Sequence, residues 1–221
     1  MRNKIAVVLL ALVLASLSHA KIYGPFHDLS GAFRNFTLGT SLGVGVSGLV
    51  GDEDIYNADS TEFGFYFDVK MAFPLSENMA VVTNIGLRNW SFRSSYNYLH
   101  RPVSDSIDVL SIEFASLWEV FLSKRFFMGL GPNIRIPFID ERVTVDGKEV
   151  FSGRPSYARK FWLNIDMVVG VKIGALELGL RGGYEMLGFY KETKEYRKVD
   201  MRELRCDFYV TYWFGYWING N

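Results

Sequence analysis

The sequence predicts an all-β protein, an eight-stranded antiparallel up-and-down transmembrane β-barrel that follows a signal peptide. Three observations lead to this prediction. Large apolar residues recur at every second position in eight segments, and the connections between these segments alternate between long and short. The opposite face of the segments carries glycine and charged residues. Apolar residues at period two indicate β-strands with one face in an apolar environment.

The first twenty residues have the layout of a secretory signal peptide. Arg2 and Lys4 form a basic start, residues 5–15 are an unbroken apolar run, and small residues precede a cleavage point after Ala20. The run is too short to cross the roughly 30 Å hydrocarbon core as a helix. We expect four regions: a cleaved signal peptide (1–20), an irregular periplasmic leader (21–33), the barrel (34–217) and a C-terminal tail (218–221).

Composition argues against several classes of protein. After loss of Arg2 and Lys4 the chain carries 22 basic against 24 acidic residues, so no basic excess suggests binding to nucleic acid. The single Cys206 cannot form an intramolecular disulfide. The sequence has no Cys/His cluster of the kind that binds zinc and no glycine-rich phosphate loop before a helix, so we expect neither a metal nor a cofactor.

The first four predicted strands carry their apolar groups at every second residue. The apolar positions run from Phe36 to Val46, from Phe63 to Phe73, from Val81 to Leu87 and from Leu110 to Leu122. These strands are predicted over residues 34–47, 62–73, 79–92 and 107–122. In the third strand the parity changes before Trp90 and Phe92, which predicts a bulge or an early exit from the sheet.

The last four predicted strands repeat the pattern. Their apolar positions run from Met128 to Phe138, from Phe161 to Ile173, from Leu176 to Met186 and from Leu204 to Tyr216. These strands are predicted over residues 126–138, 161–173, 176–189 and 204–217.

The connections indicate how the strands are arranged. Long connections are predicted at 48–61, 93–106, 139–160 and 190–203, and short ones at 74–78, 123–125 and 174–175. All long loops then lie at one end of the sheet and all tight turns at the other, which is typical of outer-membrane barrels. Within the third long loop, Val143–Phe151 predicts a hairpin that turns at Asp146-Gly147.

Alternation alone does not say which face points outward, because a lipocalin-like soluble barrel has its apolar residues inside. The composition of the other face decides between them. Glycine in mid-strand is unfavourable on a solvated face but fits the crowded lumen of a small barrel. We therefore expect the apolar face to contact lipid. The charged inner residues are predicted to form a structural network: Asp68, Lys70, Arg88, Glu113, Glu119, Arg135, Asp166, Lys172, Glu177, Arg181, Glu185, Arg205 and Asp207.

Aromatic residues near the tight-turn ends predict an interfacial girdle, as in other barrels of this type. The residues expected in it are Trp118, Tyr212, Trp213, Tyr216 and Trp217.

The pattern over residues 34–217 resembles the small eight-stranded outer-membrane proteins of the OmpA/OmpX type and the outer membrane protein beta-barrel domain families. The resemblance is one of pattern, not of a diagnostic motif. It implies a place in the outer membrane of a diderm (Gram-negative) bacterium and insertion by the barrel assembly machinery. We also expect a monomer in contact with outer-membrane lipid and lipopolysaccharide, and we cannot name a surface ligand.

Three classes of function remain open. The favoured one is a structural or surface-interaction barrel that acts through its outer loops, because it requires nothing beyond the fold. The others are a small pore and a lipid A-modifying enzyme that uses His100 and a nearby serine such as Ser104. A Ser–His pair can activate a hydroxyl for acyl transfer. No catalytic residue is predicted on the favoured reading.

Overall fold

The computed structural model describes residues 36–51, 62–76, 78–98, 101–155, 158–188 and 201–214. The predicted signal peptide, leader and C-terminal tail lie outside these ranges, as do His100, Tyr216 and Trp217. In the part of the chain that the structure describes, no helix is long and apolar enough to cross a membrane.

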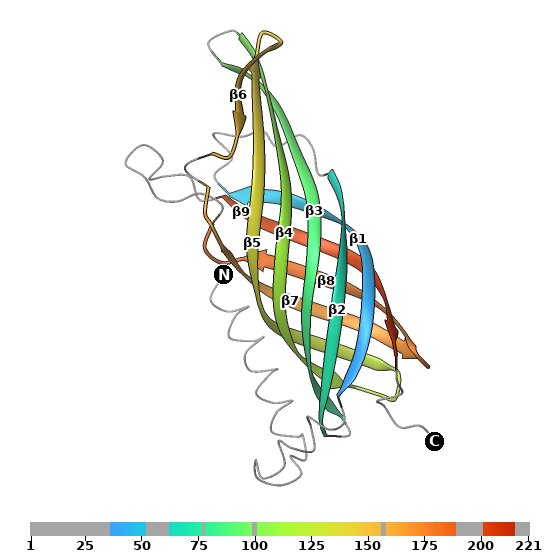
Figure 1. The fold of residues 1–221 in the computed structure, drawn as a ribbon. Coiled ribbons are helices and arrows are strands. Elements are labelled where there is room, and N and C mark those ends of the chain that lie inside the picture. Colours follow the sequence, from blue (N-terminus) through green and yellow to red (C-terminus); the bar gives the residue numbers. More distant parts are fainter. Residues whose placement is uncertain are drawn as a thin grey trace.

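The described chain forms nine strands, of which eight close into a barrel (Figure 1). Each barrel strand is antiparallel to its neighbours, and β1 pairs with β9 to complete the ring. The strands are β1 (Thr37–Gly51), β2 (Glu62–Ser76), β3 (Met79–Tyr98), β4 (Arg101–Phe121), β5 (Phe126–Val145), β6 (Lys148–Gly153), β7 (Trp162–Ile173), β8 (Leu176–Glu185) and β9 (Met201–Trp213). The predicted eight-stranded antiparallel barrel is confirmed, with β6 as an addition outside the ring.

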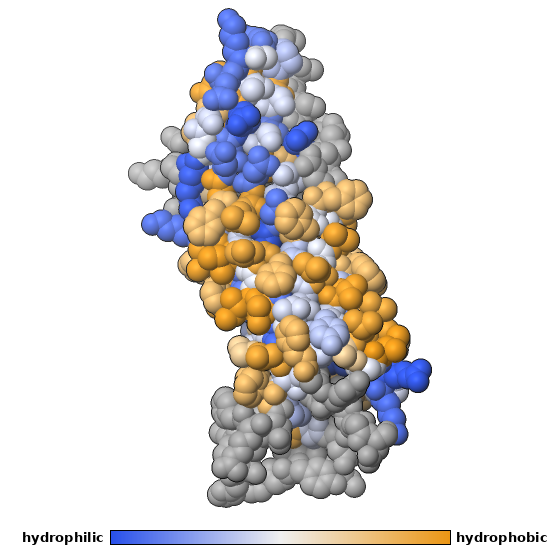
Figure 2. Space-filling view, turned by 45° about the vertical axis from the view of Figure 1, so that its right-hand side comes forward, coloured by the Kyte–Doolittle hydropathy of each residue, from blue (hydrophilic) through white to orange (hydrophobic). Residues whose placement is uncertain are grey.

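The two faces of each barrel strand differ as the alternation predicts. Along β7 buried residues alternate with more exposed ones, and Ile165, Met167 and Val169 on the outer face are 39%, 44% and 37% exposed. Charged Asp166 between them is fully buried. Apolar side chains form a band around the barrel on the face drawn in Figure 2, and hydrophilic residues lie above it. The apolar face therefore points outward, and the polar face lines the interior.

Two glycines on the inner face leave room for large neighbours. A Cβ atom added at Gly43 would lie 2.2 Å from the ring of Tyr66, and one at Gly179 would lie 2.6 Å from the ring of Tyr209. Both tyrosines are buried. An eight-stranded barrel is only wide enough for its own side chains, so small residues on one strand accommodate rings from the next.

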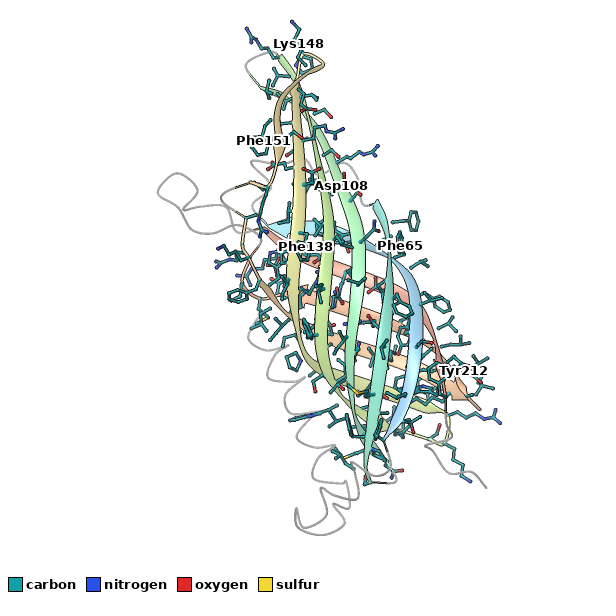
Figure 3. All side chains as sticks on the ribbon, in the orientation of Figure 1. Phe65, Asp108, Phe138, Lys148, Phe151 and Tyr212 are labelled. Carbon is teal, nitrogen blue, oxygen red and sulfur yellow. The ribbon has the colours of Figure 1, made fainter. Side chains whose placement is uncertain are left out.

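Strands β3, β4 and β5 extend well beyond the other barrel strands at one end (Figures 1 and 3), which is also the hydrophilic end above the apolar band (Figure 2). β3 and β4 pair without a break from Met79↔Val120 to Tyr98↔Arg101. The long loop predicted at 93–106 is therefore wrong, because most of it is a regular hairpin. We call the parts of β3, β4 and β5 above the band, together with β6, the outer extension.

The hairpin predicted at Asp146-Gly147 is confirmed. β5 and β6 pair from Val145↔Lys148 to Glu141↔Gly153. Asp146 and Gly147 have φ angles of 52° and 73°, the left-handed conformation that a two-residue hairpin turn of this kind requires. The turn lies at the far end of the outer extension, next to Lys148 in Figure 3.

The bulge predicted before Trp90 and Phe92 is wrong. The β3–β4 register is continuous through both residues, which are each 1% exposed. Their parity matches that of inward-facing Arg88. The apparent change of parity is therefore no change in strand geometry. It arises because the inner face becomes apolar above the charged part of the lumen.

Of the three described residues predicted in the aromatic girdle, two point outward and one does not. Trp118 and Tyr212 point outward and are 54% and 50% exposed. Trp213 is only 2% exposed, and its indole Nε1 donates a hydrogen bond to Glu177 inside the barrel. The strand ends also differ slightly from the prediction, since β8 ends at Glu185 and β9 begins at Met201.

The outward face gives a first test in lipid. Met167→Arg should lower the free energy of unfolding by about 2–4 kcal/mol, because it places a charge on the lipid face of β7. Met167→Leu should change it little, since the apolar contact with lipid is kept. Urea titration of the folded barrel in lipid vesicles measures both variants. Equal stability of the two would show that this face does not contact lipid.

Candidate functional site: the charged interior of the barrel

All thirteen charged residues predicted on the inner face are buried inside the barrel. They lie in three layers between the tight-turn end and the outer extension. The lower layer holds Lys70, Glu119, Lys172 and Glu177; the central layer holds Asp68, Arg88, Glu113, Asp166, Arg181, Arg205 and Asp207; the upper layer holds Arg135 and Glu185.

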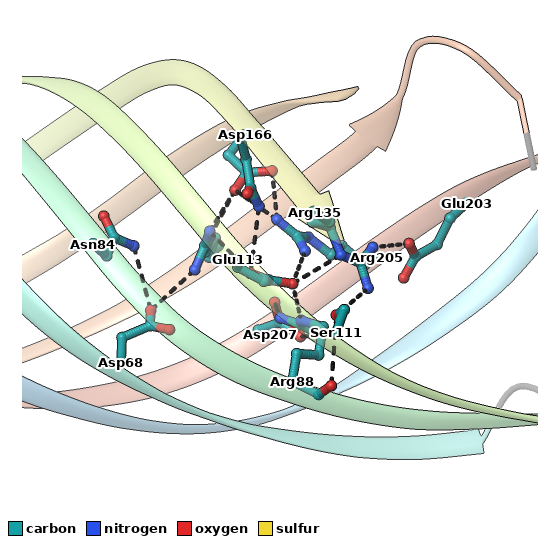
Figure 4. A network of polar contacts seen from close by, with 12 residues as sticks. Asp68, Asn84, Arg88, Ser111, Glu113, Arg135, Asp166, Glu203, Arg205 and Asp207 are labelled. Atoms are coloured by element: carbon teal, nitrogen blue, oxygen red, sulfur yellow. Dashed lines mark hydrogen bonds and ion pairs between the residues drawn. The ribbon is translucent and has the colours of Figure 1, made fainter. Parts of the chain in front are cut away.

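Four guanidinium groups surround the carboxylate of Glu113 on β4 (Figure 4). Its Oε1 lies 2.8 Å from Arg205 Nη1, 2.9 Å from Arg88 Nε and 3.0 Å from Arg135 Nε. Arg181 Nη2 lies 3.4 Å from the other oxygen. The arginines come from β3, β5, β8 and β9, so a single carboxylate links five of the eight barrel strands.

Two further carboxylates offset the charge of these arginines. Asp166 Oδ2 accepts hydrogen bonds from Arg181 Nη2 at 2.6 Å and from Arg205 Nη2 at 2.5 Å. Both terminal nitrogens of Arg88 donate to Asp207, with Nη1 at 3.0 Å from Oδ1. Two-pronged pairs of this kind are among the stronger hydrogen bonds in proteins and fix side-chain orientation.

Asparagines complete the central layer. Asn84 donates to Asp68 at 3.3 Å, and Asp68 also accepts a bond from Arg181 at 3.2 Å. Asn133 donates to Asp166 at 2.9 Å. Both asparagines are buried. The predicted network contained only charged residues, although the same parity places these amides on the inner face.

The lower layer pairs two lysines with two glutamates. Lys172 Nζ lies 3.2 Å from both Glu119 and Glu177, and Lys70 Nζ lies 3.1 Å from Glu177. Trp213 Nε1 donates to Glu177 at 2.9 Å. The inward turn of Trp213 is thus explained, because its indole N–H bonds a buried carboxylate.

Aromatic rings pack around the same lysines. Lys70 Nζ lies 4.1 Å from the ring centre of Tyr209. Lys172 Nζ lies 4.6 Å from that of Phe121 and 4.8 Å from that of Phe127. Cation–π contacts of this type are favourable when desolvated. Rings and lysine side chains together fill the lumen towards the tight-turn end.

The upper layer includes one acid outside the predicted network, Glu203. Arg135 Nη1 donates to Glu203 Oε2, and its guanidinium lies 5.0 Å from the ring centre of Trp162. Glu203 is 1% exposed. The prediction had placed it at the end of a charged outer loop, whereas it belongs to β9. Glu203 lies two residues from Arg205 and four from Asp207 on the same strand, so the alternation of the strand could have predicted that it points inward.

An apolar cluster lies above the charges and below the end of the outer extension. Trp90 and Trp162 are its largest members, with ring centres 6.3 Å apart. Trp90 follows Arg88 by two residues on β3, and Trp162 is the register partner of Arg135, so the cluster adjoins the upper layer. We call it the upper apolar cluster: Trp90, Phe92, Ile107, Val109, Ile139, Ala158 and Trp162.

A buried acid lies in the outer extension. Asp105 is on the inner face of β4 and is 1% exposed. It lies five residues from Leu110 of the apolar band, in the direction of the outer end of the strand. Burial, together with the nearby carboxylate of Glu141, raises the pKa of Asp105 to about 7. This carboxyl group therefore changes charge near neutral pH.

The residues considered for catalysis are only partly described. His100 lies outside the described residues. Ser104 is exposed on the outer face of β4, whereas Asp105 is buried on the inner face. Successive side chains of a strand point to opposite faces, so this serine and this acid do not converge on one site.

Comparisons with known proteins find only distant likenesses. No protein-family model and no curated protein matches the chain. Among solved structures, the attachment invasion locus protein Ail of Yersinia pestis is 13% identical over 80% of this chain and 98% of its own, with a TM-score of 0.48. Neisserial surface protein A is 10% identical over 80% and 96% of the two chains, with a TM-score of 0.44. Both TM-scores lie below 0.5, so nothing about this chain is concluded from these likenesses.

Neutralising the central carboxylate should destabilise the barrel. Glu113→Gln leaves four buried arginines without their common partner and should cost about 3–5 kcal/mol in free energy of unfolding. The matched control is Glu149→Gln. Glu149 lies 3.5 Å from Arg142 at the surface, where loss of the pair should cost roughly 0–1 kcal/mol. Urea titration compares the two. Similar losses would show that the interior network contributes little.

Asp105 should make stability fall as the pH rises. Its pKa is higher in the folded chain than its ordinary value of 3.8, so folding favours the protonated form. The stabilisation is complete below about pH 4 and is lost as the pH rises to 7 and above. Asp105→Asn mimics the protonated acid. Thermal unfolding should show the variant close to wild type at pH 5 and more stable at pH 8. A variant with the pH profile of wild type would contradict the assignment.

Proposed function

We propose that the protein is an outer-membrane barrel that is closed to solutes and acts as a structural or surface-interaction protein through its outer extension. The observation that carries this proposal is the filled interior. Three layers of charged side chains, most of them in ion pairs, occupy the lumen, with aromatic rings among those of the lower layer and the upper apolar cluster at the other end.

The packing of the lumen disfavours the alternative of a small pore. The charged groups are of both signs and within 2.5–3.4 Å of their partners in the ion pairs around Glu113 and Asp166. Buried charges that lose a partner are strongly destabilising. Opening a water path would require breaking several of these pairs at once.

The outer extension is the part of the described chain that reaches farthest from the lipid. On β4 it continues nine residues beyond Leu110, which is roughly 30 Å along the strand at ~3.4 Å per residue. β6 pairs only with β5 among the described strands, and Val150 and Phe151 on it are 61% and 41% exposed. An exposed strand edge can pair with an extended segment of another chain. These features support a role in surface interaction.

The cellular setting follows from the same proposal. The signal peptide would direct the chain through the inner membrane, and the barrel assembly machinery would insert it. The apolar band would then contact outer-membrane lipid and lipopolysaccharide, with the protein as a monomer. Each barrel strand obtains its backbone hydrogen bonds within the closed sheet, so a single chain suffices.

Conductance measurements test the closed lumen. Purified protein in planar bilayers should show no steady channels. Arg181→Gln should lower the stability of the barrel before it produces any current, because Arg181 pairs with both Asp68 and Asp166. Stable, ion-selective steps from wild-type protein would refute the closed barrel and favour the small pore.

Epitope tags test the orientation. A tag inserted at Gly147, in the turn of the outer extension, should be reached by antibody on intact cells. A tag at Gly174, in the tight turn between β7 and β8, should be reached only after the outer membrane is broken. Equal labelling of both sites, or recovery of the protein in the soluble periplasm, would overturn the proposed location.

A further inference from the structure

Acids outnumber bases in the interior. The buried charged residues of the described chain are ten acids and six bases. All six bases take part in ion pairs, and the acids in excess of them lie towards the outer extension. Glu185 and Glu203 form the part of this surplus that lies directly inside the barrel.

Glu185 and Glu203 lie side by side on β8 and β9. They stand one residue beyond the pair Tyr184↔Leu204, and the backbone N–H of Glu203 donates to Glu185 Oε2 at 3.3 Å. Both side chains face the lumen, at 0% and 1% exposure. Like charges directly opposite each other on adjacent strands are destabilising, and burial strengthens the repulsion.

A third polar side chain completes a row across three strands. Asn164 on β7 is the register partner of Glu185 and is fully buried on the same inner face. Neither atom of its amide has a hydrogen-bond partner, and the same is true of Glu185 Oε1 and Glu203 Oε1. Buried polar atoms are almost always satisfied, and a group of unsatisfied ones indicates a missing ion or water.

We propose that Asn164, Glu185 and Glu203 bind a hard divalent cation, Ca²⁺, inside the upper lumen. The two free carboxylate oxygens and Asn164 Oδ1 are the oxygen ligands that Ca²⁺ prefers, and water completes its shell. Ca²⁺ also tolerates irregular ligand geometry better than Mg²⁺ does. A water molecule alone would donate to both glutamates but would supply no charge to Glu185, whereas Glu203 already pairs with Arg135.

Two bases, Arg135 and Arg159, act electrostatically on Glu185 without forming an ion pair with it. No group of three or more His, Cys, Asp and Glu in the described residues is arranged to hold a metal; this row combines two carboxylates with an amide. Arg135 occupies Oε2 of Glu203, which leaves Oε1 for the cation. No ion pair among the described residues joins Glu185 to a base. With three protein ligands, the affinity should be in the range of weak extracellular sites, with Kd of about 10⁻⁴–10⁻³ M.

Refolding with different cations tests the proposal. Wild-type protein refolded into detergent micelles with 10 mM Ca²⁺ should unfold a few degrees higher than protein refolded with EDTA, because a ligand that binds only the folded state stabilises it. Mg²⁺ should have a smaller effect. Glu185→Gln should abolish the Ca²⁺-dependent shift. Asn164→Asp adds a third carboxylate and should enlarge the shift while lowering stability in EDTA.

Glu119→Gln is the matched control, because Glu119 is an equally buried acid that already pairs with Lys172. It should lower the midpoint in all buffers and leave the Ca²⁺-dependent shift unchanged. No Ca²⁺ response in wild type would mean that water or a proton fills the row, and the proposal would be overturned. A response that persists in Glu185→Gln would place the cation elsewhere and overturn it equally.

Discussion

Backbone hydrogen bonding in an apolar solvent is the constraint on which the whole structure depends. Hydrocarbon offers no partner for peptide groups, and each unsatisfied group costs several kcal/mol. A strand can therefore enter the membrane only as part of a sheet with no open edge. The pairing of β1 with β9 removes the last edge. Once the ring is closed with eight strands, its diameter is set, and so is the volume that the inner side chains must fill.

The inner side chains meet this volume requirement with long charged groups, whose charges must then be paired. Ion pairs in a low-dielectric interior are favourable only when nearly every charge has a partner. In the lower and central layers the structure meets this requirement with ion pairs that reach across the lumen. Arg88 on β3 pairs with Asp207 on β9, 119 residues later in the chain. The aromatic rings and the upper apolar cluster limit the access of water to these pairs.

The sequence predicts the strands well because the alternation of apolar and polar residues has a direct physical cause, the lipid outside and the packed lumen inside. It predicts less well where a face changes its chemistry. Trp90 and Phe92 point inward although they are apolar, because they lie where the inner face meets other apolar groups and not charges. Trp213 points inward, where its indole N–H donates a hydrogen bond to the carboxylate of Glu177. Glu203 was missed because a charged run looks like a loop until its partner strand is known. The partners of each charge depend on barrel register and on reach across the lumen, which periodicity does not contain.

The charged interior also makes the register specific. A slip of one residue in any strand would move its whole set of inner charges to the lipid face. It would also remove those charges from partners on other strands, as Glu113 on β4 is held by arginines from β3, β5, β8 and β9. The contacts with Arg88 and Arg135 join neighbouring strands, whereas those with Arg181 and Arg205 form only when the ring closes, because β8 and β9 are the last strands of the chain. The desolvation of the charges is therefore offset only in the correctly closed barrel. An apolar lumen of equal volume would not specify the register in this way, since it would pack almost as well in a shifted register. The interior network thus favours closure and the correct register together.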